Sequence, residues 1–208
     1  CILSISMKEE IVQRGAEAVL IKKGSMMLKR RVAKGYRLKT LDDKLRRIRT
    51  RKEAKLLEKA GKLINVPKMI KVSDTTMEID MEFIDGKKLS EHLDGMKNSK
   101  EVCLEIGKSI ATLHDAVIIH GDLTTSNMIW SEGKLYFIDF GLGYENGRTE
   151  DKAVDLHLIK QALEAKHFLH FKGFFDSIKK GYETSKEYKE TMKRFEKVEQ
   201  RGRYKEQY

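Results

Sequence analysis

Polar side chains inside two otherwise apolar segments constrain the fold of this chain most. The stretch IIHGDLTTSNMIW, residues 118–130, interrupts an apolar run with Asp122 and returns to apolar residues after Asn127. The stretch LYFIDFG, residues 135–141, places Asp139 in a second apolar segment. A buried carboxylate is costly unless it binds a cation or accepts strong hydrogen bonds. These segments therefore predict a folded protein with a charged site between buried elements.

The three side chains suit metal-assisted phosphate chemistry. Carboxylate and amide oxygens are ligands for Mg²⁺, which takes one or two protein oxygens and completes its shell with phosphate and water. Asn127 and Asp139 are therefore the predicted metal ligands. Asp122, at the head of the same loop, is the predicted catalytic residue, which accepts a proton or orients a nucleophile. The alternative is a set of polar turns that cap helices.

The spacing of these residues resembles that of the protein-kinase fold. Asn127 follows Asp122 by five residues, and Asp139 begins an Asp-Phe-Gly sequence twelve residues later. Kinases hold Mg²⁺ and orient the nucleophile with residues at this spacing. The sequence His-Gly-Asp stands where most eukaryotic protein kinases have His-Arg-Asp.

A kinase also needs a strand lysine for the α- and β-phosphates of ATP, held by a helix glutamate. The segment MMLKRR supplies Lys29 and the segment RKEAKLL supplies Glu53. Lys34 is the alternative lysine, but it lies just before Gly35 and is more typical of a turn. A further alternative is that Lys29 is one of many surface lysines.

Two more segments are predicted to contact the nucleotide. VQRGAEAVLIK occupies the position of the phosphate-covering loop but does not match G-x-G-x-x-G, and its alternative is a plain hairpin. The residues expected near the phosphates are Gly15, Ala16 and Glu17. MEFIDG fits the adenine-facing hinge, with an ordinary strand end as the alternative. The hinge residues are Met81, which flanks the pocket, and Glu82 and Ile84, which offer backbone donors and acceptors.

Patterns along the chain predict strands first and helices later. Apolar pairs separated by glycines predict short strands and turns over residues 8–39. Thr40 is the predicted N-cap of a helix that continues to about Lys62. Pro67 marks a break, after which residues 69–86 read as a hairpin.

Helical patterns begin at Ser90 and Ser99, and the chain after about Glu150 is helical throughout. The predicted fold class is α+β: a two-lobed, protein-kinase-like fold with a small β-rich N-lobe containing one long helix, and a compact helical C-lobe. The predicted divisions are residues 1–6, a linker or the remnant of a preceding segment; 7–84, the N-lobe; 85–195, the C-lobe; and 196–208, a basic tail.

Charge and cysteine content indicate the kind of partner and the cellular location of the protein. The chain has 42 Lys and Arg against 32 Asp and Glu, a formal net charge of +10, which favours a polyanionic partner such as nucleic acid, phosphates or an acidic protein. Two cysteines, Cys1 and Cys103, provide no disulfide framework, as in a reducing, cytoplasmic location. No apolar run approaches the roughly 18 residues of a membrane span, so we expect no membrane partner.

HGDLTTSNMIW, FIDFGLG, KRRVAKGYR and EDKAVDLHLIKQAL together resemble the small atypical kinase/ATPase subunit of the KEOPS complex, from about Met7 to the end of the chain. The resemblance implies ATP and Mg²⁺ as cofactors and a regulatory part in making N6-threonylcarbamoyladenosine in tRNA. It implies as partners the threonylcarbamoyl-transferase subunit, a small regulatory subunit and tRNA, reached directly or through the complex. In some archaea this kinase is fused behind the transferase, and the resemblance implies that such a fusion would account for a start at Cys1. The family's basic tail docks near the partner's active site, so Arg201 and Arg203 are candidate contacts.

The sequence departs from ordinary protein kinases after Gly141. About ten residues, LGYENGRTED, precede the next helical pattern, without Ala-Pro-Glu, so little platform for a peptide substrate is expected. ATP hydrolysis or autophosphorylation is therefore favoured. Asp155 resembles the helix aspartate that braces the catalytic loop of kinases and is expected to be structural.

Three alternatives remain open at this stage. A free-standing Ser/Thr protein kinase would transfer phosphate to an exogenous protein without a partner. An aminoglycoside-type phosphotransferase shares His-Gly-Asp but normally has a larger helical lobe. A pseudokinase scaffold would bind a partner and tRNA without a rise in melting temperature from Mg-ATP, and the complete set of kinase residues argues against it.

Overall fold

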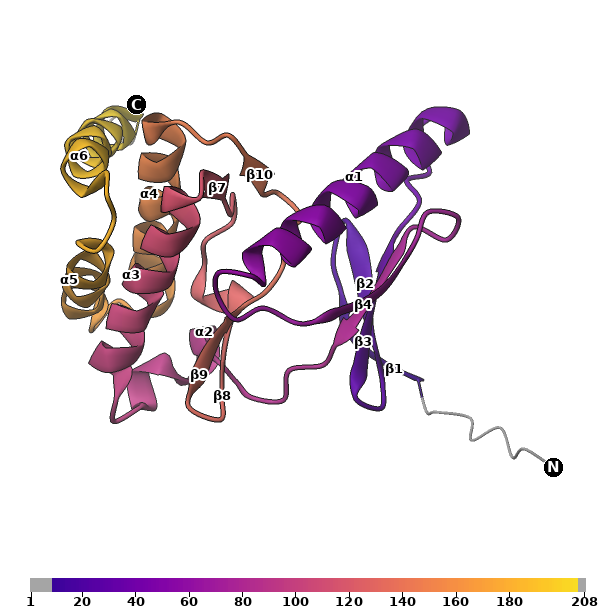
Figure 1. Ribbon diagram of the computed structural model, residues 1–208, viewed down its shortest axis with the longest axis horizontal. Coiled ribbons are helices and arrows are strands. Elements are labelled where there is room, and N and C mark those ends of the chain that lie inside the picture. Colours follow the sequence, from indigo (N-terminus) through magenta and orange to yellow (C-terminus); the bar gives the residue numbers. More distant parts are fainter. Residues whose placement is uncertain (1–8, 206–208) are drawn as a thin grey trace.

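The structure is a computed structural model that describes residues 9–205, the last four of them by backbone alone (Figure 1). The predicted linker over residues 1–6 lies outside the described residues. In Figure 1, strands and one long helix form the N-terminal part, and the remaining helices gather on the other side of the molecule. The expected α+β architecture, with a β-rich N-terminal lobe and a helical C-terminal lobe, is confirmed.

The N-terminal lobe contains a five-stranded antiparallel sheet in the order β1-β2-β3-β5-β4. Its strands are β1 (Glu9–Arg14), β2 (Ala18–Lys23), β3 (Met26–Arg31), β4 (Met69–Ser73) and β5 (Glu78–Glu82). Gly24 has a φ of 59° in the two-residue turn that joins β2 to β3, and glycine adopts this conformation without a Cβ clash. Ile21, Leu28 and Ile79 are buried on this sheet.

The long helix α1 (Lys39–Ala60) crosses the sheet, as Figure 1 shows. It buries Leu56, Leu57 and Ala60, which join the main hydrophobic core. The predicted N-cap, Thr40, is wrong: the cap residue is Leu38, and no side chain caps it. Asp42 instead pairs with Arg46 and Arg37, so the start of the helix is tied down by ion pairs within and just before its first turns.

The C-terminal lobe contains two small sheets and five helices of varied length. One sheet joins β6 (Lys87–Lys88), β8 (Met128–Ser131) and β9 (Lys134–Phe137), and the other joins β7 (Ile118–Ile119) to β10 (Tyr144–Glu145). The helices are α2 (Leu89–His92), α3 (Ser99–Asp115), α4 (Thr149–Lys166), α5 (Phe171–Tyr182) and α6 (Tyr188–Lys205), with 3₁₀ turns η1 (Leu93–Gly95) and η2 (Thr125–Asn127). The helix starts expected at Ser90 and Ser99 agree with α2 and α3 to within one residue.

Helices α3 and α5 pack closely through two glycines. A Cβ on Gly107 would lie 2.0 Å from the Ile178 carbonyl oxygen, and one on Gly181 would lie 2.1 Å from the Leu104 carbonyl oxygen. The two helices therefore meet backbone to backbone at these glycines. No helix within residues 9–205 is long and apolar enough to cross a membrane.

Candidate active site

Three predicted site residues from distant parts of the chain meet in one ion-pair cluster. Lys29 Nζ on β3 donates to Glu53 Oε1 on α1 at 2.6 Å and to Asp139 Oδ1 at 2.8 Å. Lys29 and Glu53 are almost fully buried, whereas the Asp139 side chain is 45% exposed. Burial lowers the pKa of Lys29, but the charges of Glu53 and Asp139 outweigh it, so the net pKa is raised. Lys29 is therefore a buried cation held between two carboxylates, of which that of Asp139 is exposed to solvent.

Arg31 is a second buried cation in this cluster, which was not predicted from the sequence. Its guanidinium donates to Glu53 Oε2 at 2.5 Å, and its side chain is 6% exposed. Glu53 therefore binds one cation on each carboxylate oxygen. The signal was present in KRR, because residues two apart on a strand share a face and Arg31 lies two positions after Lys29.

The loop between β7 and β8 orders the predicted catalytic aspartate. Asn127 Nδ2 donates to Asp122 Oδ2 at 2.8 Å and to its carbonyl oxygen at 3.0 Å. Asp155 on α4 accepts from the backbone N–H groups of His120 at 2.8 Å and Gly121 at 2.9 Å. The structural role expected for Asp155 is confirmed, since its carboxylate braces the start of the loop.

His120 is a buried link whose role was not predicted from the sequence. Its Nδ1 accepts from the Asp122 backbone N–H at 3.3 Å, so Nε2 carries the proton that is donated to the Ile138 carbonyl oxygen at 3.2 Å. Burial lowers the pKa of His120, although neighbouring carboxylates raise it in part. A neutral imidazole therefore connects the segment of Asp122 to the segment of Asp139.

Backbone geometry presents Asp139 to the site. Its φ is 63°, a left-handed conformation that aspartate adopts more readily than most residues. The Gly141 N–H donates to Asp139 Oδ1 at 3.1 Å. Burial raises the pKa of Asp139, but the charge of Lys29 and these hydrogen bonds hold the net pKa below its usual value. The carboxylate is therefore ionised at neutral pH and its Oδ2 has no protein donor among the described residues.

A cavity between the two lobes contains most of the predicted nucleotide residues. It is lined by Lys29, Glu53, Met81, Glu82, Ile84, Asn127 and Asp139, together with the apolar side chains of Leu20, Met27, Leu57, Ile129, Ile138 and Phe140. Gln13 and Phe83, which lie in the two segments predicted to contact the nucleotide, also line it, and so do Lys88 and Ser126, which were not predicted from the sequence. A concave site with apolar walls and a few polar groups is typical of a small-molecule pocket.

The hinge segment offers fewer backbone groups than expected. The Glu82 N–H donates to the Lys68 carbonyl oxygen at 2.9 Å, and the Phe83 N–H donates to the Ser25 carbonyl oxygen at 3.0 Å. The backbone N–H of Glu82 is therefore not available to a nucleotide. The Ile84 N–H forms no hydrogen bond within the described part of the chain, so it is the donor available at this wall of the cavity.

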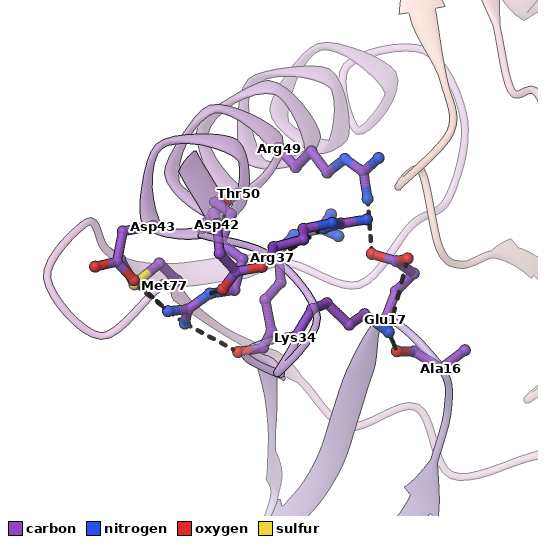
Figure 2. A network of polar contacts seen from close by, with 11 residues as sticks. Ala16, Glu17, Lys34, Arg37, Asp42, Asp43, Arg49, Thr50 and Met77 are labelled. Atoms are coloured by element: carbon purple, nitrogen blue, oxygen red, sulfur yellow. Dashed lines mark hydrogen bonds and ion pairs between the residues drawn. The ribbon is translucent and has the colours of Figure 1, made fainter. Parts of the chain in front are cut away.

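The turn over Gly15, Ala16 and Glu17 lies outside the residues that line the cavity. Figure 2 shows it tied to the N-terminal half of α1 and the loop before it. Lys34 donates to the Ala16 carbonyl oxygen, and Arg49 donates to Glu17 Oε2 at 2.7 Å. Lys34, the alternative to Lys29, is therefore engaged with this turn. Contact of the turn with a nucleotide stays a prediction.

The residues present fit a divalent cation held jointly with phosphate. Asn127 and Asp139 line the same cavity, and the Asn127 amide nitrogen faces Asp122, which leaves its oxygen for a metal. Among the described residues, no group of three or more His, Cys, Asp and Glu side chains forms a metal site by itself. This donor set matches Mg²⁺, which takes few protein ligands when phosphates complete its shell.

The segment after Gly141 is short and fixed. Tyr144 and Glu145 pair with β7, and the Gly147 N–H donates to the Val117 carbonyl oxygen at 3.1 Å. Glu145 also pairs with Lys59 of α1. The segment is thus attached to both lobes and forms no separate platform beside the site.

The predicted partner contacts lie far along α6. Arg201 Nη1 donates to Glu150 Oε1 at 2.9 Å, and the Arg201 side chain is 65% exposed. The side chain of Arg203 lies outside the described residues. Helix α6 also carries Glu199, which pairs with Lys160 and His157 on α4. Helix α6 therefore continues through this segment to Lys205, and Glu199 and Arg201 attach it to α4.

Comparisons with known proteins agree with this geometry. A family model described as the RIO domain matches residues 22–150. The chain is 44% identical over 187 residues to the "KEOPS complex subunit Bud32" of Pyrococcus abyssi, covering 87% of this chain and 85% of the relative. It is 35% identical over 210 residues to the "EKC/KEOPS complex subunit BUD32" of Enterocytozoon bieneusi, covering 94% and 99%.

A longer type of relative also matches. The chain is 37% identical over 207 residues to the "bifunctional tRNA threonylcarbamoyladenosine biosynthesis protein" of Methanobrevibacter smithii. This match covers 96% of the chain but 38% of the relative, so the chain spans well under half of that protein.

Proposed function

The chain belongs to the RIO-domain family and, within it, to the group of Bud32 subunits, and from this premise we propose that it is a Mg-ATP-dependent atypical Ser/Thr kinase and ATPase. We propose further that it acts as a regulatory subunit of the KEOPS complex in tRNA N6-threonylcarbamoyladenosine modification, in the cytoplasm. The observation that carries the proposal is the meeting of Lys29, Glu53 and Asp139 in the cavity that Asn127 also lines.

Each residue of the cluster has a role in this proposal. Lys29 binds the α- and β-phosphates, and Glu53 keeps it aimed at them. Asn127 and Asp139 hold Mg²⁺, which supplies positive charge to the phosphates during transfer. The ion pair between Lys29 and Asp139 supports these assignments, because it holds both groups at the same wall of the cavity before nucleotide arrives.

Asp122 is proposed to act on the nucleophile. Its Oδ2 is held by Asn127 Nδ2, which leaves Oδ1 to accept the proton of a hydroxyl or to orient a water molecule. His120 and Asp155 hold the backbone on either side of Gly121. An aspartate held in place raises the rate of transfer, because the entropy cost of orienting it toward the nucleophile is met before the reaction begins.

Met81, Glu82 and Ile84 are proposed to receive the adenine, with the Ile84 N–H as the free backbone donor. Gly15, Ala16 and Glu17 are proposed to reach the phosphates after the turn moves. The pairs that hold the turn involve exposed Glu17 and Arg49, and exposed pairs are weak enough for such a movement.

The short segment after Gly141 favours hydrolysis or autophosphorylation over broad protein phosphorylation. It is bonded to β7 and to α1, so a peptide would find no extended surface beside Asp122. A free-standing Ser/Thr kinase remains the second candidate, because all five kinase residues are present. It differs in requiring transfer to an added protein without partners.

The partners follow from the relatives' names. Two of them are named as subunits of the KEOPS complex, and a longer one as a bifunctional threonylcarbamoyladenosine biosynthesis protein. We therefore propose the threonylcarbamoyl-transferase subunit, a small KEOPS subunit and tRNA as partners, with Arg201 and Arg203 as transferase contacts. A net charge of +10 supports an approach to tRNA, directly or in the complex.

The test is reconstitution. ATP hydrolysis and threonylcarbamoyladenosine formation are measured with the chain alone, with the transferase subunit, and with that subunit and tRNA. The proposal expects hydrolysis that rises with partner and tRNA, together with modified tRNA. Rapid phosphorylation of an added protein by the chain alone, with no response to partner or tRNA, would support the second candidate instead.

A further inference from the structure

His167 is a buried residue that joins the C-terminal end of α4 to the loop of the candidate active site. It follows the last residue of α4, and its N–H donates to the Leu163 carbonyl oxygen at 2.8 Å. Its side chain is 1% exposed, and its ring packs edge-on against buried Phe174 with centroids 6.1 Å apart. The imidazole is therefore held in place by the helix end and by the core.

Both ring nitrogens of His167 form hydrogen bonds. Nδ1 lies 3.0 Å from Asp94 Oδ1, and Nε2 lies 3.0 Å from Thr125 Oγ1. A carboxylate oxygen accepts hydrogen bonds, so Nδ1 donates to Asp94, and Nε2 forms the second hydrogen bond with the Thr125 hydroxyl. The imidazole therefore links the Thr125 hydroxyl to the Asp94 carboxylate.

The two hydrogen-bond partners of His167, Asp94 and Thr125, differ in solvent exposure. The Asp94 side chain is 48% exposed, so water replaces a lost partner there. Thr125 is fully buried, and the bond to His167 is the one hydrogen bond of its hydroxyl among the described residues. A buried hydroxyl without a partner is costly, so the His167–Thr125 bond constrains the structure more strongly than the His167–Asp94 bond.

Thr125 opens the short turn η2, which ends at Asn127. Ser126 and Asn127 face the cavity, and the Asn127 N–H donates to the Thr124 carbonyl oxygen at 3.0 Å. Thr125 thus points into the core while its two successors point to the proposed nucleotide. Because Thr125, Ser126 and Asn127 form one short turn, a contact that holds the Thr125 side chain also holds the position of Asn127 relative to the cavity.

We infer that His167 is a positioning residue for the phosphoryl-transfer site, acting through Thr125 on Asn127 and, through the Asn127 amide, on Asp122. This inference rests on the proposed function. His167 touches neither nucleotide nor metal in this account. His167 sets the position of the Asn127 oxygen relative to Mg²⁺. It also sets the position of the Asp122 carboxylate relative to the nucleophile.

Two conservative variants separate the two bonds of His167. In His167→Gln the side-chain amide lies at the position of Nε2 and keeps a hydrogen bond to Thr125. In His167→Asn the shorter side chain places the amide at the position of Nδ1, where it forms a hydrogen bond with Asp94 alone. Replacing residues that orient a metal ligand typically costs about 10–100-fold in metal affinity or activity. We expect His167→Asn to lose hydrolysis in this range and to need more Mg²⁺, with His167→Gln much closer to wild type.

Thr125→Val removes the hydroxyl at nearly constant shape. It is expected to reproduce the defect of His167→Asn, and the double variant is expected to lose no more than either alone. His157→Asn is the matched control, because His157 is on the same helix and bonds a carboxylate, Glu199, away from the loop. This control is expected to leave the Mg²⁺ dependence unchanged.

Three readouts are measured on each variant: Mg²⁺ dependence of ATP hydrolysis, Mg²⁺ dependence of ATP binding by calorimetry, and amide hydrogen exchange at Asn127. A purely structural histidine would lower the melting temperature without altering Mg²⁺ dependence. Equal Mg²⁺ dependence in wild type, His167→Asn and His167→Gln, or fully additive losses in the double variant, would overturn the inference. Absence of hydrolysis in wild type would overturn the proposed function instead, and the binding and exchange data would still decide the role of His167.

Discussion

Lys29 Nζ lies 2.8 Å from Asp139 Oδ1, although 110 residues separate them in the chain. The pair connects β3 of the N-terminal lobe to the segment that follows β9 of the C-terminal lobe. It therefore holds both sides of the cavity together. Both groups are proposed to contact ATP or Mg²⁺, so the pair must open or rearrange when Mg-ATP binds.

The Lys29–Asp139 pair predicts a pH-dependent stability. The pKa of Asp139 in the folded protein is lowered, against about 3.9 in the unfolded chain. Its stabilisation is therefore present above the unfolded value and is lost as the pH falls through the folded pKa. The free energy of unfolding of wild type should fall toward that of Asp139→Asn on acidification. Urea denaturation at a series of pH values measures this, and parallel curves for the two proteins would contradict it.

Glu53 should be the most sensitive member of the cluster for stability. Glu53→Gln keeps the shape but removes the carboxylate that Lys29 and Arg31 share, which leaves buried Arg31 without its carboxylate partner and Lys29 with Asp139 alone. Removing one partner of a buried pair costs about 3–5 kcal/mol. Chemical denaturation measures the loss, with Asp74→Asn, which breaks an exposed pair with Arg51, as a control expected to change little. Similar stabilities of the two variants would contradict the prediction.

The contact of α3 with α5 predicts opposite results for two glycines. Gly107→Ala places a Cβ against the Ile178 carbonyl oxygen and should destabilise the protein by about 1–3 kcal/mol or more. Gly173→Ala, on α5, meets no atom within 4 Å and should stabilise by up to about 1 kcal/mol, since alanine favours a helix. Thermal unfolding of the two variants tests this pair, and a shift of the same sign in both would contradict the packing described.

The pKa of His120 should lie below the usual value for histidine. Its folded pKa is lowered from about 6.5 by burial, so its contribution to stability is present above that value and is lost as the pH falls through the folded pKa. Nitrogen-15 NMR should show a neutral ring protonated at Nε2 at pH values near 6.5. A ring that titrates at or above about 6.5, or one protonated at Nδ1, would contradict the hydrogen bonds to Ile138 and Asp122.

Some of this site follows from sequence because its parts are local. Asp122 and Asn127 lie on one loop, so their spacing alone predicts that they meet, as they do at 2.8 Å. The pairing of Lys29 with Glu53 required a known fold, since nothing local links a strand residue to a helix residue 24 positions later. The hinge residues were also located by their place in that fold.

Other parts were beyond the reach of sequence patterns. The link from Thr125 through His167 to Asp94 spans 73 positions, and it exists because α4 ends beside two turns. Thr40 fits the preference for an N-cap, but the helix begins one residue earlier, at Lys39, with Leu38 as its cap residue. In the first of these places tertiary packing decides the structure, and a propensity or a motif describes only the segment that carries it.

The most direct test of the central claim is Mg²⁺-dependent ATP hydrolysis by wild type, Asp139→Ala and the control Asp176→Ala, a carboxylate exposed on α5. Loss of a metal ligand removes several kcal/mol of charge stabilisation in the transition state, so Asp139→Ala should lose activity by more than about 100-fold. Asp176→Ala should match wild type. Hydrolysis by Asp139→Ala at the rate of the control would contradict the assignment of this cluster as the site of phosphoryl transfer.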